Sequence, residues 1–281
     1  MQNKIEQNTI HKLETNGNDF LIAQKENHTP GWIKRISNRH LGIGCDQVLI
    51  ITEPQNKTTK CTFFNQDGSP AEMCLNGVYA LAYFLHNKNN TTWSIHTKHA
   101  IFTTEMSQKK LLIHIDKNLI TEQKEIYLTL PEHHTAIRGH HINTGNDHLI
   151  IKTNNINSFP LETIGKALQN SKNFPDGINV SAVSRHANNQ LEMRTFERGA
   201  GLTQACGSAG LAAFTSLPPS IGEPTLIQQP GGEVIFTKSK DSIIMKANCN
   251  YIGKITLTLQ PLLVQPEEQL QTNDQSIAES D

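Results

Sequence analysis

The feature that most constrains this chain is an internal repeat whose matching positions lie 128 to 132 residues apart. Turn segments, strand segments and two cysteine-containing segments all recur. The matches are Gly17-Asn18-Asp19 with Gly145-Asn146-Asp147, Gln47-Val48 with Asn179-Val180, and Phe64 and Cys74 with Phe196 and Cys206. A repeat this long, present in only two copies, excludes a solenoid and predicts two similar domains about a pseudo-twofold axis. Equivalent sites would then face each other across one cleft.

Short apolar runs bounded by Gly and Asn turns predict strands, and longer periodic stretches predict helices. Strands are expected at 20–23, 48–52, 61–65, 93–97, 101–106, 111–115, 178–183, 191–196, 233–237, 242–247 and 254–259, and helices at 32–38, 78–86, 161–169 and directly after Cys206. This mixture predicts an α/β (α+β) fold. We expect an N-terminal domain at 1–127, completed by a C-terminal strand near 254–263, and a second domain at 128–253.

The two ends of the chain differ in character from the repeats. Residues 1–10 are predicted to be an irregular leader. The stretch 265–281 is polar and acidic without apolar periodicity, and we expect it to be a disordered tail.

Composition narrows the class of protein. The formal net charge of −1 gives no basic surface for nucleic acid, and no apolar run is long enough to span a membrane. We therefore expect a cytoplasmic protein without nucleic-acid or membrane partners. The five cysteines form no Cys-x-x-Cys pair and no zinc spacing, so no metal site is predicted and free thiols are favoured over structural disulfides.

Cys74 and Cys206 each stand just before a predicted helix. Backbone N–H groups and the helix dipole at such a position favour negative charge, so we expect a lowered thiol pKa. Two thiols facing each other across an α-carbon could remove a proton from one face and return one to the other. The intermediate would need donors aimed at its carboxylate, and the scheme requires no cofactor. A single such cysteine is more often a buried packing residue, which is how we interpret Cys45, Cys61 and Cys249.

Polar residues near these cysteines are the remaining candidates. Asn18, Gln47, Asn65, Asn146 and Asn179 lie at predicted turn–strand junctions, where each singly could be only a turn residue. Arg198 suits a second carboxylate, and Glu197 suits an ammonium, although a solvated surface ion pair is the alternative. His148 lies in a repeat motif and could tune a thiol or play a structural part.

Together these motifs resemble those of the diaminopimelate epimerase family. The residues that carry the resemblance are Gly17-Asn18-Asp19-Phe20, 39–47, 64–69, Cys74-Leu75-Asn76-Gly77, 144–148, 197–201, 205–208 and 230–232. The resemblance extends from about residue 12 to residue 259. Two positions depart from the family pattern, because Leu75 stands where Gly is usual and Asp147 where Pro is usual.

The resemblance implies two pseudosymmetric domains, each a mixed sheet or barrel wrapped around a central helix, in a homodimer. It implies cofactor-independent interconversion of L,L- and meso-diaminopimelate, with Cys74 and Cys206 as the acid/base pair and His148 and Glu197 adjusting their pKa values. The substrate would be bound by Asn18, Gln47, Asn65, Leu75, Asn76, Asn146, Asn179, Glu197, Arg198, Gly207 and Ser208. Two alternatives stay open: a two-thiol racemase of another amino acid, and a catalytically idle amino-acid-binding protein.

Overall fold

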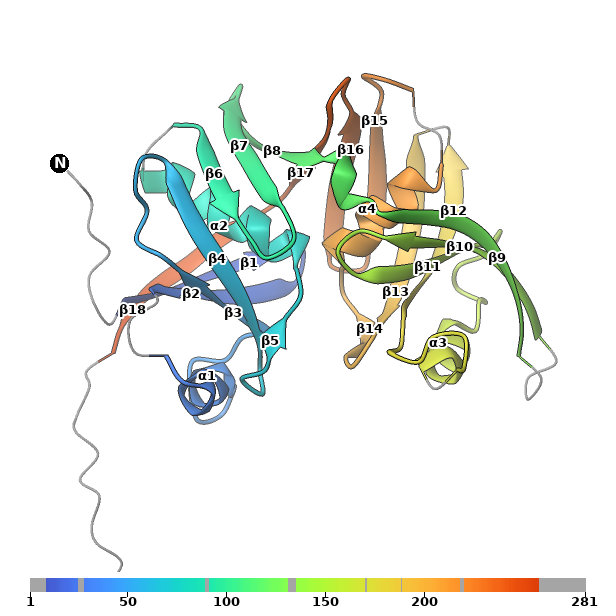
Figure 1. Cartoon of the computed structure of the whole chain (residues 1–281), viewed down its shortest axis with the longest axis horizontal. Helices are drawn as coiled ribbons and strands as arrows, with labels where there is room; N and C mark the ends of the chain where they lie inside the picture. Colours follow the sequence, from blue (N-terminus) through green and yellow to red (C-terminus); the bar gives the residue numbers. More distant parts are fainter. Residues whose placement is uncertain are drawn as a thin grey trace, which may run out of the picture.

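In the computed structural model, two halves of similar architecture lie side by side, as Figure 1 shows. The structure describes residues 9–24, 28–88, 91–130, 135–169, 171–187, 189–217 and 220–257. The predicted acidic tail at 265–281 lies outside these residues.

One half is built from the first part of the chain and its last strand. Its strands are β1 (Thr9–Thr15), β2 (Asn18–Gln24), β3 (Gln47–Ile51), β4 (Thr58–Asn65), β5 (Pro70–Ala71), β6 (Trp93–His96), β7 (Ile101–Ser107), β8 (Lys110–Asp116) and β18 (Asn250–Thr256), and its helices are α1 (Pro30–Ser37) and α2 (Leu75–Lys88). β18 is antiparallel to β1, which joins the two ends of the described chain.

The strands of the other half are β9 (Glu122–Leu130), β10 (Thr135–Asn143), β11 (Asp147–Lys152), β12 (Asn179–Ala187), β13 (Gln190–Glu197), β14 (Gly201–Thr203), β15 (Pro224–Gln229), β16 (Gly232–Lys238) and β17 (Ser242–Ala247), and its helices are α3 (Leu161–Gln169) and α4 (Gly207–Thr215). This half has the same order of elements from β10 to β17, and β9 pairs with β10 as β18 pairs with β1. A 3-10 turn, η1 (Lys117–Leu119), precedes β9. The halves are joined where β8 pairs with β17.

Strand register reproduces the sequence repeat. β2 and β3 are parallel with Phe20 opposite Gln47, and β11 and β12 are parallel with His148 opposite Asn179. Thr58 pairs with Ser94, and 132 residues later Gln190 pairs with Leu226. The repeat in the sequence is therefore a repeat in backbone pairing as well.

Each half wraps its sheet around one central helix, which confirms the predicted fold class. Nearly every residue of α2 and every residue of α4 from Gly207 to Phe214 is buried, as is expected of a helix that is apolar on all sides. On β2, Phe20 and Ile22 face α2, whereas Leu21 and Ala23 face α1 on the outside. Both faces of these strands are covered, which explains their continuous apolar runs.

Several strands were not predicted from the sequence, and the predicted end of the N-terminal leader is wrong. The strands that were not predicted are β1, β5, β9, β10, β11, β14 and β15. β9 and β10 mix polar and apolar residues, and much of β9 is exposed. The leader was predicted to extend to residue 10, but β1 begins at Thr9. Ile10 is buried and packs in one cluster with Leu21 and Ala23. Among the described residues, none of the helices has the length and apolar character needed to cross a membrane.

Candidate active site

A cleft of about 970 Å³ lies between the halves. All of the predicted site residues except His148 line it. They are Asn18, Gln47, Asn65, Cys74, Leu75 and Asn76 from one half, and Asn146, Asn179, Glu197, Arg198, Cys206, Gly207 and Ser208 from the other. Residues at equivalent positions of the repeat therefore line the same cleft, which contains one cysteine from each half.

Cys74 is the residue before α2. Its sulfur accepts the Gly77 N–H at 3.4 Å, so the thiol sits on the free amides of the helix N-terminus. The thiol also lies 3.7 Å from Asn18 Oδ1. Cys74 is partly buried and is a free thiol.

Cys206 occupies the equivalent place as the N-cap of α4. Its backbone N–H donates to Gln229 Oε1 at 2.8 Å, and its sulfur lies 3.4 Å from Ser208 Oγ. Cys206 is buried and is also a free thiol. Gln229 was not predicted from the sequence; it directly precedes the Pro230-Gly231-Gly232 turn, which was the available signal.

The N-termini of α2 and α4 come very close to each other. A Cβ added to Gly207 would lie 3.0 Å from Leu75 Cβ and 2.7 Å from Asn76 Oδ1. Leu75 and Gly207 are equivalent positions in the repeat, so a large residue in one half meets the smallest in the other. Leu75 is fully buried and packs in the main core, and it also lines the cleft.

The expected lowering of the thiol pKa values is wrong. Burial raises the pKa of Cys74 to about 12, and burial together with the negative charge of Glu197 raises that of Cys206 well above its ordinary value. Backbone N–H groups at the helix starts act in the opposite direction, but desolvation of the thiolate outweighs them.

Asn18 is oriented by a charged network that the sequence did not single out. Asp46 Oδ2 accepts from Asn18 Nδ2 at 2.7 Å, which leaves Asn18 Oδ1 on the side of Cys74. Arg39 bridges Asp46 and Asp19 at 2.7 and 2.8 Å. Asp46 lies within the Cys45-Asp46-Gln47 segment, whose spacing could have indicated it.

Asn179 links Arg198 to the start of β11. Its Nδ2 donates to the Asp147 carbonyl at 2.9 Å, and its Oδ1 accepts the Arg198 N–H at 3.0 Å. The Arg198 guanidinium donates to the Asp176 carbonyl at 3.1 Å. The backbone and guanidinium of Arg198 are thus both fixed by neighbouring loops.

Asn146 connects the two halves beside Cys74. Its Nδ2 donates to the carbonyl of Met73, the residue before Cys74, at 3.0 Å. Asn76 reaches in the other direction, from its Nδ2 to the carbonyl of Ala205, the residue before Cys206, at 3.4 Å. Each cysteine is therefore held in part by an asparagine of the opposite half.

Glu197 lies beside Cys206, and burial raises the pKa of its carboxyl group. The Thr203 hydroxyl donates to Glu197 Oε1 at 2.6 Å and opposes that rise. Thr203 was not predicted as a site residue, although it follows Glu197 closely in the Gly201-Leu202-Thr203 segment. In this position Glu197 makes deprotonation of Cys206 harder, which is a direct electrostatic influence on that thiol.

The structure does not bring His148 into the cleft. His148 shares the inner face of β11 with Ile150, two residues on, and its repeat equivalent is the buried Phe20. Burial lowers its pKa to about 3, and neither ring nitrogen has a hydrogen-bond partner within the described residues. A strand alternates its side chains between two faces, and this alternation directs His148 to the core.

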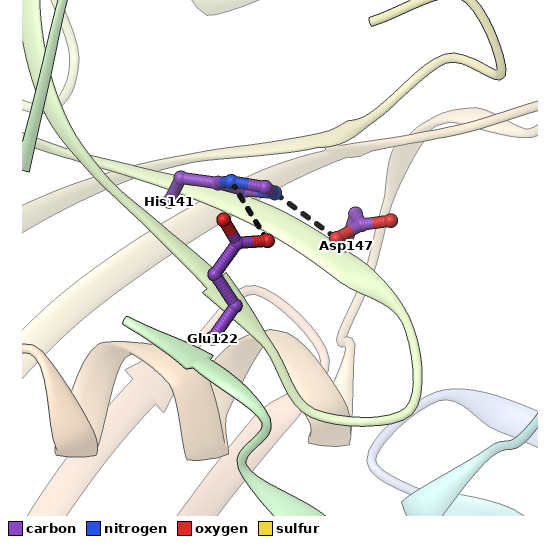
Figure 2. Close-up of side chains that lie close together, drawn as sticks. All are labelled: Glu122, His141 and Asp147. Carbon is purple, nitrogen blue, oxygen red and sulfur yellow. Dashed lines mark hydrogen bonds and ion pairs between the residues drawn. The ribbon is translucent and has the colours of Figure 1, made fainter. Parts of the chain in front are cut away.

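The Asp147 side chain lies against His141, which also contacts Glu122 (Figure 2), and Asp147 is not among the described residues that line the cleft. His141 Nε2 lies 3.0 Å from Asp147 Oδ1, and His141 Nδ1 lies 3.5 Å from Glu122 Oε2. A histidine with two carboxylates could in principle bind a divalent metal. Here each ring nitrogen faces its own carboxylate, and Lys124 Nζ already pairs with Glu122 at 2.5 Å. The arrangement is one imidazole held between two carboxylates.

Known proteins resemble this chain in sequence over most of its length. The sequence profile of the family described as diaminopimelate epimerase matches residues 11–117 and 140–248. A diaminopimelate epimerase from Methanococcus maripaludis is 32% identical over 248 residues, covering 80% of this chain and 90% of its own length. One from Teredinibacter turnerae is 30% identical over 254 residues, covering 80% and 89%.

Two solved structures share the fold at low sequence identity. A probable proline racemase from Agrobacterium radiobacter superimposes with a TM-score of 0.64 at 12% identity, covering 91% of this chain and 94% of its own. A phenazine biosynthesis protein of the PhzF family from Enterococcus faecalis gives a TM-score of 0.64 at 12% identity, covering 89% and 99%.

Proposed function

The chain belongs to the diaminopimelate epimerase family, and we propose that it is the isomerase that interconverts L,L- and meso-diaminopimelate with Cys74 and Cys206 as its two acid/base groups. The observation that carries the proposal is the placement of both free thiols, one at the start of α2 and one at the start of α4, on one cleft. The role would lie on the route to lysine and peptidoglycan. The resemblance further leads us to propose a homodimer, which a monomeric mass in solution would contradict.

In the proposed reaction, one cysteine acts as a thiolate and takes the α-proton from one face of the substrate. The other cysteine, as a thiol, gives its proton to the opposite face of the planar intermediate, and the centre inverts. The free N–H groups of Asn76 and Ser208 at the two helix starts are the preorganised donors for the substrate carboxylate. The reverse reaction exchanges the roles of the two thiols.

Recognition of the second carboxylate is assigned to Arg198 with Asn65 and Asn179. These three line the same cleft, and a planar guanidinium matches the geometry of a carboxylate. A substrate with only one carboxylate would have no group for these three residues to bind. This is why we favour a dicarboxylate over a simple amino acid.

The raised pKa values make formation of the thiolate the demanding step. With a pKa of about 12, only about one Cys74 in 10⁵ is ionised at pH 7. The α-ammonium group of the substrate brings a positive charge next to the thiols, and a nearby opposite charge favours the ionised form. We therefore expect the reactive thiolate to form mainly in the substrate complex.

The test uses reduced enzyme with L,L-diaminopimelate in heavy water, following the α-deuterium and the two isomers by NMR. Epimerisation with one deuterium incorporated at the inverted centre supports the proposal. Cys74→Ser and Cys206→Ser should each abolish inversion, and Cys249→Ser, a half-buried thiol outside the cleft, should retain it.

The alternatives give different results in the same experiment. A racemase of another amino acid would leave diaminopimelate unchanged and exchange the α-hydrogen of a different substrate in a panel. An idle binding protein would bind ligand without any exchange. Inversion at the parental rate by either cleft-cysteine variant would rule out the two-thiol scheme.

A further inference from the structure

A second cavity, of about 340 Å³, lies beside the first half and shares no lining residue with the catalytic cleft. It is bounded by the middle of α2, the turn between β7 and β8, and the end of β17. β8 and β17 are the strands that join the halves (Figure 1). A ligand in this cavity would touch both halves at their junction. Its volume is within the range of small-molecule sites.

Three lysines line this cavity and no carboxylate does. Lys109 lies in the β7–β8 turn, Lys110 is the first residue of β8, and Lys246 lies near the end of β17. Within the described ranges, none of the three forms an ion pair with an acidic side chain. Burial and the charge of Lys110 lower the pKa of Lys246. Like charges gathered around a concave surface are unfavourable unless an anion is bound between them.

His86 adds a buried polar group to the wall of the same cavity. It is 8% exposed, and its Nε2 lies 2.9 Å from Thr104 Oγ1. Its Nδ1 is buried without a hydrogen-bond partner among the residues that the structure describes. The Thr104 hydroxyl donates to the Trp93 carbonyl at 3.4 Å, so Nε2 carries the ring proton and donates to Thr104 Oγ1, and Nδ1 is an acceptor. An acceptor offers no hydrogen bond to an anion, so the lysines and not His86 supply the charge recognition in this cavity.

The part of the cavity formed by α2 is aromatic. Tyr79 and Tyr83 lie one turn apart on α2 and both line the cavity. The Tyr79 hydroxyl is already occupied by the Leu111 carbonyl at 3.0 Å. These rings therefore supply an apolar surface beside the cationic one.

We propose that this cavity is a binding site for a small anion with two or more negative charges, held between Lys110 and Lys246 with Lys109 as a further contact. The shared chemistry is that of a multiply charged phosphate or polycarboxylate. Because the site bridges β8 and β17, an occupant would stabilise the junction of the two halves. The proposal is independent of the catalytic reaction, since it concerns binding at a different place.

The experiment measures binding of inorganic pyrophosphate and of citrate to the full chain by calorimetry and thermal shift, at ionic strength matched with sodium chloride. Saturable binding of one or both probes to the parent chain is expected, and the stronger probe identifies a phosphate or a carboxylate ligand. Lys110→Gln/Lys246→Gln should weaken that binding at least tenfold. The control Lys60→Gln/Lys152→Gln removes the same charge from exposed positions elsewhere and should bind as the parent does.

The catalytic cleft also contains helix N-termini and Arg198, so the same titration is run on Arg198→Gln. Binding that persists in Arg198→Gln and is lost in Lys110→Gln/Lys246→Gln supports the proposal. Binding lost only in Arg198→Gln would place the anion in the catalytic cleft and overturn it. Absence of saturable binding to the parent, or equal binding by the lysine variant, would also overturn it. None of these outcomes depends on whether the chain epimerises diaminopimelate.

Discussion

Replacing Gly207 with alanine tests whether the contact between α2 and α4 sets the alignment of the two thiols. The added methyl group would lie 2.7 Å from Asn76 Oδ1, 3.0 Å from Leu75 Cβ and 3.1 Å from the Asn76 backbone nitrogen. Leu75 and Asn76 are both buried, at 0% and 1% exposure, so neither can turn into solvent. The start of α4 and the start of α2 must therefore move apart.

The expected magnitudes differ for stability and for catalysis. Overpacking a core typically costs about 1–3 kcal/mol, and alanine regains up to about 1 kcal/mol of helix propensity over glycine. We expect a net loss of about 1–2 kcal/mol in the free energy of unfolding. A displacement of about 1 Å between reacting groups reduces the rate on the order of 100-fold. The loss of kcat should therefore be larger than the loss of stability suggests.

The assay compares urea unfolding with the kcat for epimerisation of L,L-diaminopimelate. Gly31→Ala is the matched control, because Gly31 is also near a helix start and its added Cβ would meet only Thr29 Oγ1 at 4.0 Å. That control should keep the parental kcat and unfold at the same or slightly higher urea concentration. If Gly207→Ala loses stability but keeps the parental kcat, the helix contact does not set the spacing of the thiols, and our reasoning is wrong.

Three further predictions concern one residue of the cleft and two buried positions outside it. His148→Phe should make stability less sensitive to acid. The imidazole of His148 has a pKa of about 3 in the folded chain and about 6.5 in the unfolded chain. The free energy of unfolding is therefore unaffected by this group above about pH 6.5 and falls as the pH is lowered below that value. The loss is about 2 kcal/mol at pH 5, and urea titrations at pH 7.5 and 5 should show a smaller decline in the variant. Arg198→Lys should raise the KM for diaminopimelate about 10- to 100-fold with a smaller effect on kcat, because one ammonium replaces a bidentate guanidinium; an unchanged KM in steady-state assays would argue against the distal-carboxylate role. Gly165→Ala should destabilise the chain by about 1–3 kcal/mol, since the new methyl would lie 2.4 Å from Phe196 Cγ, and an unchanged melting temperature would contradict this.

Most of the cleft could be predicted from the sequence because its residues lie in short motifs that recur in both halves. Repeat-equivalent motifs occupy equivalent places in the fold, so Asn18 and Asn146, or Cys74 and Cys206, had to face a common axis. The same logic failed for His148, because the repeat fixes its position on a strand but not the face to which its side chain points. The residues that orient the site without belonging to a repeated motif, such as Arg39 and Gln229, were not recognised.

By itself, the sequence determined the duplication, the fold class, the two cysteines at helix starts and most of the polar residues around them, because these depend on local pattern and spacing. Only the tertiary structure decided three further properties: the pairing of β8 with β17 that joins the halves, the burial that raises both thiol pKa values, and the fit of Leu75 against Gly207. Each of them depends on segments far apart in the chain. Strand pairing, desolvation and close packing are set by what surrounds a residue in space, and a local sequence pattern does not contain that information.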